Sequence, residues 1–343
     1  MKALVLKEYN KLVYEDIPVP EFGEDEVLIR VKACGICGSD IHGLDGSTGR
    51  RVPPLVMGHE ASGIVVGLGS RVSDLRAGER VTFDSTIYCG ACEFCREGRI
   101  NLCDNRRVIG VSCDEYRRNG AFAEYIAVPG RCVYPIPDTL SFEQAATVEP
   151  LSVAVHAVSR TGVSSGDTAV VVGAGMVGLL AIQVLRARGC KYIYAADIDL
   201  ERLRLACKLG ADEGFNPSLS DLPAEVFRRT GGRGADVVLE AVGLTSTVQS
   251  SVALLRKGGS LALVGNLSAE VGLPLQKTVA RELSLYGSCA SSGEYPECLE
   301  MLSKGVVKVD ELLSASVPLA DGAGWFERLY RGEKRLIKVC LLP

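Results

Sequence analysis

Four cysteines within 15 residues constrain this chain more than any other feature of its sequence. Two spacers of two residues and one of seven separate Cys89, Cys92, Cys95 and Cys103. This spacing lets four thiolates surround one tetrahedral ion, so it predicts a closed structural zinc site in a lobe at about residues 89–103. A disulfide knot or a redox pair is the alternative, but the odd total of 13 cysteines and the length of 343 residues weigh against it. A closed site leaves no position for a substrate, so it holds a loop and performs no chemistry.

Length and composition favour two well-packed domains. A chain of 343 residues exceeds one ordinary core, and its 47% hydrophobic and 23% charged residues are typical of a globular protein. The net charge is -4 and the charges of both signs are interspersed, so the sequence predicts no basic face that could bind nucleic acid. The longest apolar run, at 169–182, is too short to span a membrane, and the first residues lack the pattern of a secretory signal. We therefore expect a cytoplasmic protein with neither nucleic acid nor membrane as a partner.

The periodicity of the sequence changes near residue 150. Residues 1–150 carry short apolar runs broken by Gly, Pro and Asp, which is typical of a compact β-barrel with long loops. A helix is expected at 151–160. Apolar strands then alternate with helical stretches at 168–172, 192–196, 237–241, 261–264 and 283–286. Such alternation predicts a doubly wound parallel sheet. Residues 151–287 would thus form an α/β domain, and 288–343 would return to the first domain.

A glycine-rich turn follows the first of these strands. It reads G-x-G-x-x-G and comprises Gly173, Gly175 and Gly178, with Met176 and Val177 inside it. Between a strand and a helix, the motif predicts a dinucleotide whose pyrophosphate lies at the helix N-terminus. A strand-turn-helix without a ligand is the alternative. Val264, at the end of a later strand, is also expected to contact the cofactor.

An acidic residue refines this prediction. Asp197 lies 19 residues after Gly178, at the end of the next strand, where a carboxylate accepts hydrogen bonds from the adenosine ribose. It would repel a 2′-phosphate, so NAD is favoured over NADP. Arg202 qualifies this preference, because a nearby arginine can accommodate that phosphate or pack over the adenine.

A second group of potential metal ligands lies in the first domain. Cys37 and the pair His59 and Glu60 stand in glycine-flanked segments, and Glu149 lies at the domain border. Thiolate, imidazole and carboxylate suit zinc, and three protein ligands leave a fourth position open. Alternatively, Cys37 forms a redox pair with Cys34 and His59 is a core residue. The remaining histidine, His156, is assigned a structural role on the apolar helix.

These segments occur in the order found in zinc-dependent medium-chain dehydrogenases, and the resemblance covers essentially the whole chain. It rests on residues 37–42 and 58–65, the cysteine lobe and the turn at 172–175. Residues 149–153 are similar to the polyol branch, the sorbitol (L-iditol) dehydrogenases and their relatives. The resemblance implies a GroES-like β-barrel catalytic domain, a Rossmann domain for NAD, an alcohol substrate and a homodimer or homotetramer.

The same resemblance implies roles for particular residues. Cys37, His59 and either Glu60 or Glu149 would bind the catalytic zinc, the choice between the two carboxylates being open. Ser39 would take the alcohol proton and His42 would relay it to solvent. For Ser39, a hydrogen bond within its own turn is the alternative.

The chain departs from the sorbitol enzymes where they carry substrate-binding side chains. An arginine and a tyrosine are missing from residues 287–292, and a tyrosine is replaced by Gly43. Galactitol-1-phosphate and threonine dehydrogenases share the scaffold and remain alternatives. A non-catalytic NAD or redox sensor is the alternative from another functional class.

Overall fold

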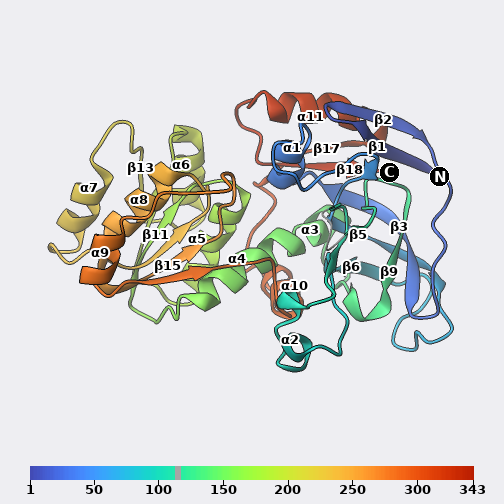
Figure 1. Ribbon diagram of the computed structural model, residues 1–343, viewed down its shortest axis with the longest axis horizontal. Coiled ribbons are helices and arrows are strands. Elements are labelled where there is room, and N and C mark those ends of the chain that lie inside the picture. Colours follow the sequence, from blue (N-terminus) through green and yellow to red (C-terminus); the bar gives the residue numbers. More distant parts are fainter. Residues whose placement is uncertain (113–116) are drawn as a thin grey trace. The chain divides into compact units, whose positions relative to one another are not determined.

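The structure is a computed structural model that describes residues 1–112 and 117–343. The chain forms two compact units. The first comprises Met1–Glu149, Ser291–Gly305 and Val309–Pro343, and the second comprises Pro150–Ala290 and Val306–Lys308. In Figure 1, blue, green and red elements of the first unit therefore lie together, because both ends of the chain contribute to it. No helix of the described ranges is long and apolar enough to cross a membrane.

The main sheet of the first unit has seven strands. Its order is β10-β6-β5-β3-β18-β17, and β9 also pairs with β3. The strands are β3 (Glu26–Gly35), β5 (Glu60–Leu68), β6 (Arg80–Phe83), β9 (Tyr125–Pro129), β10 (Val133–Pro135), β17 (Leu313–Pro318) and β18 (Lys338–Leu342). Side chains of a strand alternate between two faces, and Val27, Ile29 and Val31 of β3 are buried accordingly. β3 occupies the middle of the sheet, because it lies between β5 and β18 in the strand order.

Two smaller sheets belong to the same unit. One has the order β2-β1-β4 and the other pairs β7 with β8. Their strands are β1 (Lys2–Glu8), β2 (Lys11–Asp16), β4 (Leu55–Val56), β7 (Thr86–Ile87) and β8 (Arg107–Val108). A hydrophobic cluster that includes Leu4, Ile29 and Phe83 joins the sheets. The strand-rich domain predicted for the start of the chain is confirmed.

Short helices connect these strands. They are α1 (Gly38–Gly43), α2 (Glu93–Arg96), α3 (Phe142–Ala146), α10 (Tyr295–Ser303) and α11 (Gly322–Tyr330), with one-turn helices η1 (Ile100–Leu102), η2 (Gly130–Cys132) and η3 (Leu319–Asp321). α3 begins with a reciprocal capping box between Ser141 and Gln144. Phe326 of α11 packs edge-to-face on Phe122, with ring centroids 5.7 Å apart. This contact joins the end of the chain to the barrel core.

The second unit contains a six-stranded parallel sheet of order β13-β12-β11-β14-β15-β16. Its strands are β11 (Thr168–Val172), β12 (Tyr192–Ala196), β13 (Glu213–Phe215), β14 (Ala235–Glu240), β15 (Leu255–Leu263) and β16 (Ser284–Gly287). From β11 the chain continues through β12 to β13 at one edge of the sheet, and it then returns to β14 beside β11 and continues through β15 to β16 at the other edge. This reversal creates a switch point at the carboxyl ends of β11 and β14, where such sheets bind ligands. The predicted Rossmann fold is confirmed.

Sequence patterns located these strands unequally well. The strands at 168–172 and 192–196 match β11 and β12, whereas β15 begins at Leu255 rather than near 261. Its first half contains Arg256, Lys257, Gly258 and Gly259, so it has no apolar run, and its pairing with β14 shifts register there. The second unit also continues past 287, because Ser288 N donates to the carbonyl of Leu263 (2.9 Å).

Helices flank the parallel sheet. They are α4 (Val148–Arg160), α5 (Met176–Ala187), α6 (Leu200–Lys208), α7 (Leu222–Arg229), α8 (Thr245–Leu254) and α9 (Leu275–Ala280). α4 begins three residues before the predicted 151, so Glu149 lies in its first turn. Pro150 is compatible with this earlier start, because N–H groups of a first turn have no partner within the helix.

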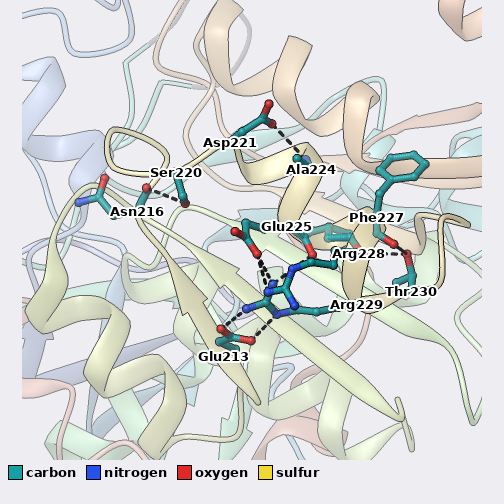
Figure 2. Close-up of polar contacts among 11 residues, drawn as sticks. Glu213, Asn216, Ser220, Asp221, Ala224, Glu225, Phe227, Arg228, Arg229 and Thr230 are labelled. Atoms are coloured by element: carbon teal, nitrogen blue, oxygen red, sulfur yellow. Dashed lines mark hydrogen bonds and ion pairs between the residues drawn. The ribbon is translucent and has the colours of Figure 1, made fainter.

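Edge strand β13 was not predicted, and ion pairs attach it to α7 (Figure 2). Arg229 at the end of α7 pairs with Glu213 of β13 and with Glu225 one turn earlier. Its guanidinium also lies 4.4 Å from the ring centroid of Phe215. Asp221 begins α7 by accepting a hydrogen bond from the backbone of the first turn. Three residues of mixed polarity make too weak a strand signal in the sequence, and only the parallel pairing with β12 reveals this edge strand.

Candidate active site and metal centres

The four cysteines of the lobe converge on one point. The Sγ atoms of Cys89, Cys92, Cys95 and Cys103 all lie within 4.8 Å of one another. Cys92 precedes α2, Cys95 lies in it, and Cys103 follows η1. Each of the four is a free thiol, and the Sγ atoms of Cys89 and Cys95 are 3.9 Å apart, far beyond a disulfide bond. The lobe therefore has the donor set of a closed four-thiolate zinc site.

The electrostatics of the lobe also fit a cation. Hydrogen bonds from the backbone of Ala91 and Cys92 lower the pKa of Cys89 to about 6. Burial and the neighbouring thiols instead raise the pKa of Cys95 to about 12. Four thiols at this spacing cannot all ionise unless a positive ion compensates their charge. The residues present thus fit zinc, which binds cysteine as the thiolate.

A second donor group lies where β3 ends and β5 begins. Cys37, His59 and Glu60 place one donor atom each within 4.8 Å of the others. The pairing of Gly35 with Glu60 across β3 and β5 brings the two segments together. Gly58 has φ of +94°, and a Cβ there would lie 2.9 Å from Cys34 Sγ, so the approach to His59 requires glycine. The set offers thiolate, imidazole and carboxylate, which suits zinc with one open position.

Glu60 has a partner that the sequence analysis missed. Lys338 of β18 places its Nζ 2.5 Å from Glu60 Oε2 and donates to the carbonyl of Ile36 (2.9 Å). The two side chains are only 3% and 1% exposed. Burial disfavours the charged lysine, but the attraction of Glu60 outweighs it and raises the pKa of Lys338. In the sequence, the only sign of this buried ion pair is a single lysine within the apolar run at 336–341.

Helix α1 carries the predicted proton-transfer residues. Ser39 and His42 are exposed, whereas Asp40 is fully buried between them. Asp40 Oδ1 lies 3.5 Å from His59 Nδ1. Burial opposes ionisation of Asp40, but the positive charges of His59 and Arg51 hold its pKa well below the usual range. Asp40 therefore supplies a fixed negative charge behind the imidazole.

Glu149 does not join the three-donor group, although it interacts electrostatically with His59 and Glu60. Burial raises the pKa of Glu149 to about 7. The nearby carboxyl group of Asp84 is buried, and this burial raises its pKa to about 7 as well. Ser291 Oγ donates a hydrogen bond to Asp84 Oδ2 at 3.3 Å. The sequence analysis did not identify Asp84, because the interaction joins positions 207 residues apart.

The surroundings of Cys34 do not favour the alternative of a redox pair with Cys37. Both thiols are free, and Cys34 is fully buried in β3. Burial raises the pKa of Cys34 well above its ordinary value, which suppresses the reactive thiolate. The two cysteines of the C-x-x-C motif lie in different elements: Cys34 is in β3, and Cys37 precedes α1.

The glycine turn of the second unit has the geometry of a dinucleotide loop. Gly173 follows β11 with φ of +98°, a conformation that glycine adopts readily. A Cβ at Gly178 would lie 1.8 Å from the carbonyl oxygen of Gly173, so the helix packs on the turn only with glycine there. A Cβ at Gly175 would meet open space, which leaves room for a ligand to approach the backbone. Gly175 caps α5, where Met176 and Val177 form the first turn.

Asp197 lies directly after β12 and contacts this turn. Its Oδ2 accepts a hydrogen bond from Ala174 N (2.7 Å) and its Oδ1 one from Asp199 N (2.9 Å). Arg202 is half-buried in the first turn of α6. The carboxylate and the glycine turn thus adjoin at the carboxyl edge of the sheet, as a ribose-binding role requires.

Glu240 is a further buried carboxylate at the same edge. It ends β14 and accepts hydrogen bonds from Val242 N (3.0 Å) and Gly243 N (2.8 Å). Val264 follows β15, and its N–H donates to the carbonyl of Glu240 (2.9 Å). Glu240 thereby shapes the turns after two strands. The sequence analysis treated it as an ordinary strand residue, since a single acid in a strand has no distinctive pattern.

Comparison with known proteins agrees with this architecture. The alcohol dehydrogenase GroES-like domain family matches residues 23–138, and the zinc-binding dehydrogenase family matches residues 176–304. Sorbitol dehydrogenase of Bacillus subtilis (strain 168) is 36% identical over 100% of this chain and 97% of its own length. D-arabitol-phosphate dehydrogenase of Enterococcus avium is also 36% identical, over 97% of this chain and 94% of its own length. The chain belongs to the zinc-dependent medium-chain alcohol dehydrogenases and is an oxidoreductase, which confirms the predicted family.

Solved structures show the same fold. A zinc-binding dehydrogenase from Sinorhizobium meliloti 1021 bound to NADP matches with a TM-score of 0.91 and 33% identity, over 100% of this chain and 99% of its own. A short chain alcohol dehydrogenase from E. coli CFT073 complexed with NADH matches with a TM-score of 0.92 and 30% identity, over 100% of this chain and 99% of its own. The two neighbours hold different dinucleotides, so fold alone does not specify the cofactor.

Proposed function

We propose that this enzyme oxidises a secondary alcohol of a polyol or sugar alcohol to a ketose or ketone, with NAD as the hydride acceptor. The observation that carries the proposal is the group of Cys37, His59 and Glu60, whose donor atoms lie within 4.8 Å of one another. Three protein ligands leave one tetrahedral position for a substrate oxygen. Relatives named for sorbitol and D-arabitol phosphate support a polyol framework as the substrate.

We further propose two zinc ions with separate roles. Glu60 is favoured as the third ligand of the catalytic ion, because it belongs to the three-donor group and Glu149 does not. Lys338 neutralises part of the charge of Glu60 and keeps its carboxylate in place. The lobe of Cys89, Cys92, Cys95 and Cys103 would hold the structural ion.

The residues of α1 provide the proton path. When bound, zinc would supply Lewis acidity toward the substrate hydroxyl, and NAD would supply the hydride-accepting group. Ser39 is exposed two residues after Cys37, so its Oγ can accept the hydroxyl proton while its own proton moves on. His42 is exposed three residues later and delivers that proton to solvent. Asp40 faces His59 Nδ1, which leaves the other ring nitrogen for the metal.

A substrate panel tests this function. NADH formation would be measured at 340 nm with polyols, their phosphate esters, threonine and simple primary alcohols, before and after chelation. We expect polyols with a secondary hydroxyl group to be oxidised most efficiently, and activity to be lost with the metal. A clear preference for phosphate esters would instead assign a sugar-phosphate dehydrogenase, and a preference for threonine would assign a threonine dehydrogenase. NAD binding without turnover of any alcohol would contradict the proposal and favour a redox sensor.

Replacing Asp197 by Ser should weaken the preference for NAD. The carboxylate lies beside the glycine turn and would face a 2′-phosphate within a few ångströms, a repulsion of several kcal/mol at an effective dielectric constant of about 20. We expect Asp197→Ser to shift the ratio of kcat/KM values toward NADP by at least about 10-fold, since 1.4 kcal/mol corresponds to that factor.

Asp199→Ser is the matched control, because Asp199 caps α6 and serine is also a good cap. That variant removes one carboxylate two positions away, so we expect it to keep the preference of the wild type. A wild-type enzyme that prefers NADP would refute the role assigned to Asp197, and Arg202 would then be the residue to examine.

We propose that two or four copies of the chain assemble. β16 lies at the edge of its sheet, so one row of its backbone groups has no neighbouring strand among residues 1–112 and 117–343. Exposed apolar side chains precede this strand: Leu267, Val271, Leu273, Leu275 and Val279. A second copy would cover both features. Sedimentation that returns the mass of a single 36.5 kDa chain would exclude this assembly.

We place the protein in the cytoplasm. The lobe requires reduced thiols to bind a metal ion, and a reducing compartment maintains them.

A further inference from the structure

Arg51 has the largest side chain among the fully buried residues of the described chain. It is only 2% exposed. A guanidinium remains charged and carries five N–H donors, so its burial is costly unless those donors find acceptors. The position of Arg51 therefore depends on its partners, and these lie in α1 of the candidate active site.

The guanidinium binds two consecutive residues of α1. Its Nε and Nη2 both donate to Asp40 Oδ1, at 3.1 and 2.8 Å. Nη2 also donates to Ser39 Oγ at 3.1 Å. One nitrogen atom thus joins the hydroxyl proposed to accept the substrate proton to the carboxylate behind the metal-binding imidazole. Because Arg51 can only donate, the hydroxyl proton of Ser39 must point away from it.

The shape of α1 accommodates Arg51. A Cβ at Gly43 would lie 2.4 Å from Arg51 Cγ and 3.2 Å from Arg51 Cβ. These atoms are near the backbone and cannot move aside as the end of a flexible side chain could. The aliphatic part of Arg51 therefore occupies the space that any larger residue at position 43 would need.

Asp40 extends the connection toward the donor group. Its Oδ1 lies 3.5 Å from His59 Nδ1, and its Oδ2 accepts a hydrogen bond from Cys37 N at 3.4 Å. Arg51 fixes the orientation of this carboxylate by binding Oδ1 with two nitrogens. Partners of this kind behind a metal ligand set its orientation, and their loss typically costs about 10- to 100-fold in metal affinity or activity.

We propose that Arg51 is a positioning residue of the alcohol-oxidising site, which holds Ser39 Oγ in the orientation for proton transfer and holds Asp40 against His59. The inference rests on the proposed function for its kinetic effect but not for its effect on the metal site. Arg51 is not one of the three donor residues and would act through its two neighbours on α1, Ser39 and Asp40.

Arg51→Met tests this role, because it removes the charge and the hydrogen bonds and keeps much of the volume. The probe is Co²⁺ introduced at the open site of the full-length protein, whose visible absorption depends on ligand geometry. We expect a changed Co²⁺ spectrum and a metal affinity at that site lower by about 10- to 100-fold, with zinc retained in the lobe. We also expect kcat to fall by about 10- to 100-fold with the KM for NAD unchanged. Arg51→Lys keeps the charge but lacks the planar guanidinium group, so its metal affinity and kcat should lie between those of the wild type and Arg51→Met.

Arg118→Met is the matched control, because it removes a different arginine of the same unit, a partly buried one that pairs with Glu26. We expect that variant to retain the wild-type Co²⁺ spectrum and kcat. A folded Arg51→Met protein with a wild-type spectrum, metal affinity and kcat would overturn the proposal.

A second variant covers the case in which Arg51→Met does not fold. Gly43→Ala leaves every charge in place and displaces the arm of Arg51, so we expect a changed Co²⁺ spectrum and a lower kcat. An unchanged spectrum and kcat in a folded Gly43→Ala protein would overturn the proposal as well. If the wild type oxidises no alcohol, the proposed function fails, but the Co²⁺ spectra and affinities still decide the role of Arg51.

Discussion

Replacing Cys37 by Ala is expected to abolish alcohol oxidation while the fold and dinucleotide binding survive. Cys37 supplies the only thiolate of the donor group that it forms with His59 and Glu60. Loss of the metal removes several kcal/mol of charge stabilisation in the transition state. Because 1.36 kcal/mol corresponds to a factor of ten, kcat/KM should fall by at least about 10³-fold. Steady-state kinetics, zinc analysis and NADH binding would be measured on the same preparation.

Cys132→Ala provides the control for Cys37→Ala. Cys132 is a buried thiol of the same unit that donates to the carbonyl of Thr86, outside both metal-ligand groups. We expect this variant to retain its zinc and its activity. A fully active Cys37→Ala enzyme, or one that keeps the zinc content of the wild type, would contradict the assignment. Zinc analysis of Glu60→Gln and Glu149→Gln would identify the third ligand, since only loss of the true ligand should release the catalytic ion.

The second large effect is expected from Cys103→Ala, which should destabilise the protein before it affects the chemistry. A closed zinc site contributes folding free energy directly, and with three thiolates the lobe loses its tetrahedral set. We expect zinc content to fall by one ion per chain and the free energy of unfolding to fall by more than about 4 kcal/mol, a loss typical of removing a structural metal. Thermal unfolding and limited proteolysis would measure the change.

Cys207→Ala is the control for the lobe, because Cys207 is an exposed thiol of α6 outside both donor groups. It should match the wild type in zinc content and stability. At a temperature where Cys103→Ala remains folded, its kcat should stay within a few-fold of the wild-type value. A Cys103→Ala protein with unchanged stability and zinc content would show that the lobe does not hold a structural ion.

Features that depend on short stretches of chain could be predicted from the sequence. The spacing of Cys89, Cys92 and Cys95 brings their thiols together within seven residues, and the glycines after β11 form a turn that few other residues allow. Runs of apolar residues likewise located β11 and β12, because strands of a parallel sheet are buried on both faces. In each case the physical cause lies within about 30 residues, so it leaves a local pattern.

The remaining features depend on contacts between distant parts of the chain. Lys338 neutralises Glu60 across a separation of 278 residues, because β18 returns to pair with β3. Arg51 reaches Ser39 and Asp40 from a loop whose sequence carries no motif. A single charged residue leaves no periodic signal, and whether its burial is tolerated depends on the partner that the fold brings to it. Local patterns therefore predicted the two groups of candidate metal ligands, with Glu60 and Glu149 left as alternatives for one position. The arrangement of strands instead selected the residues that contact those candidate ligands.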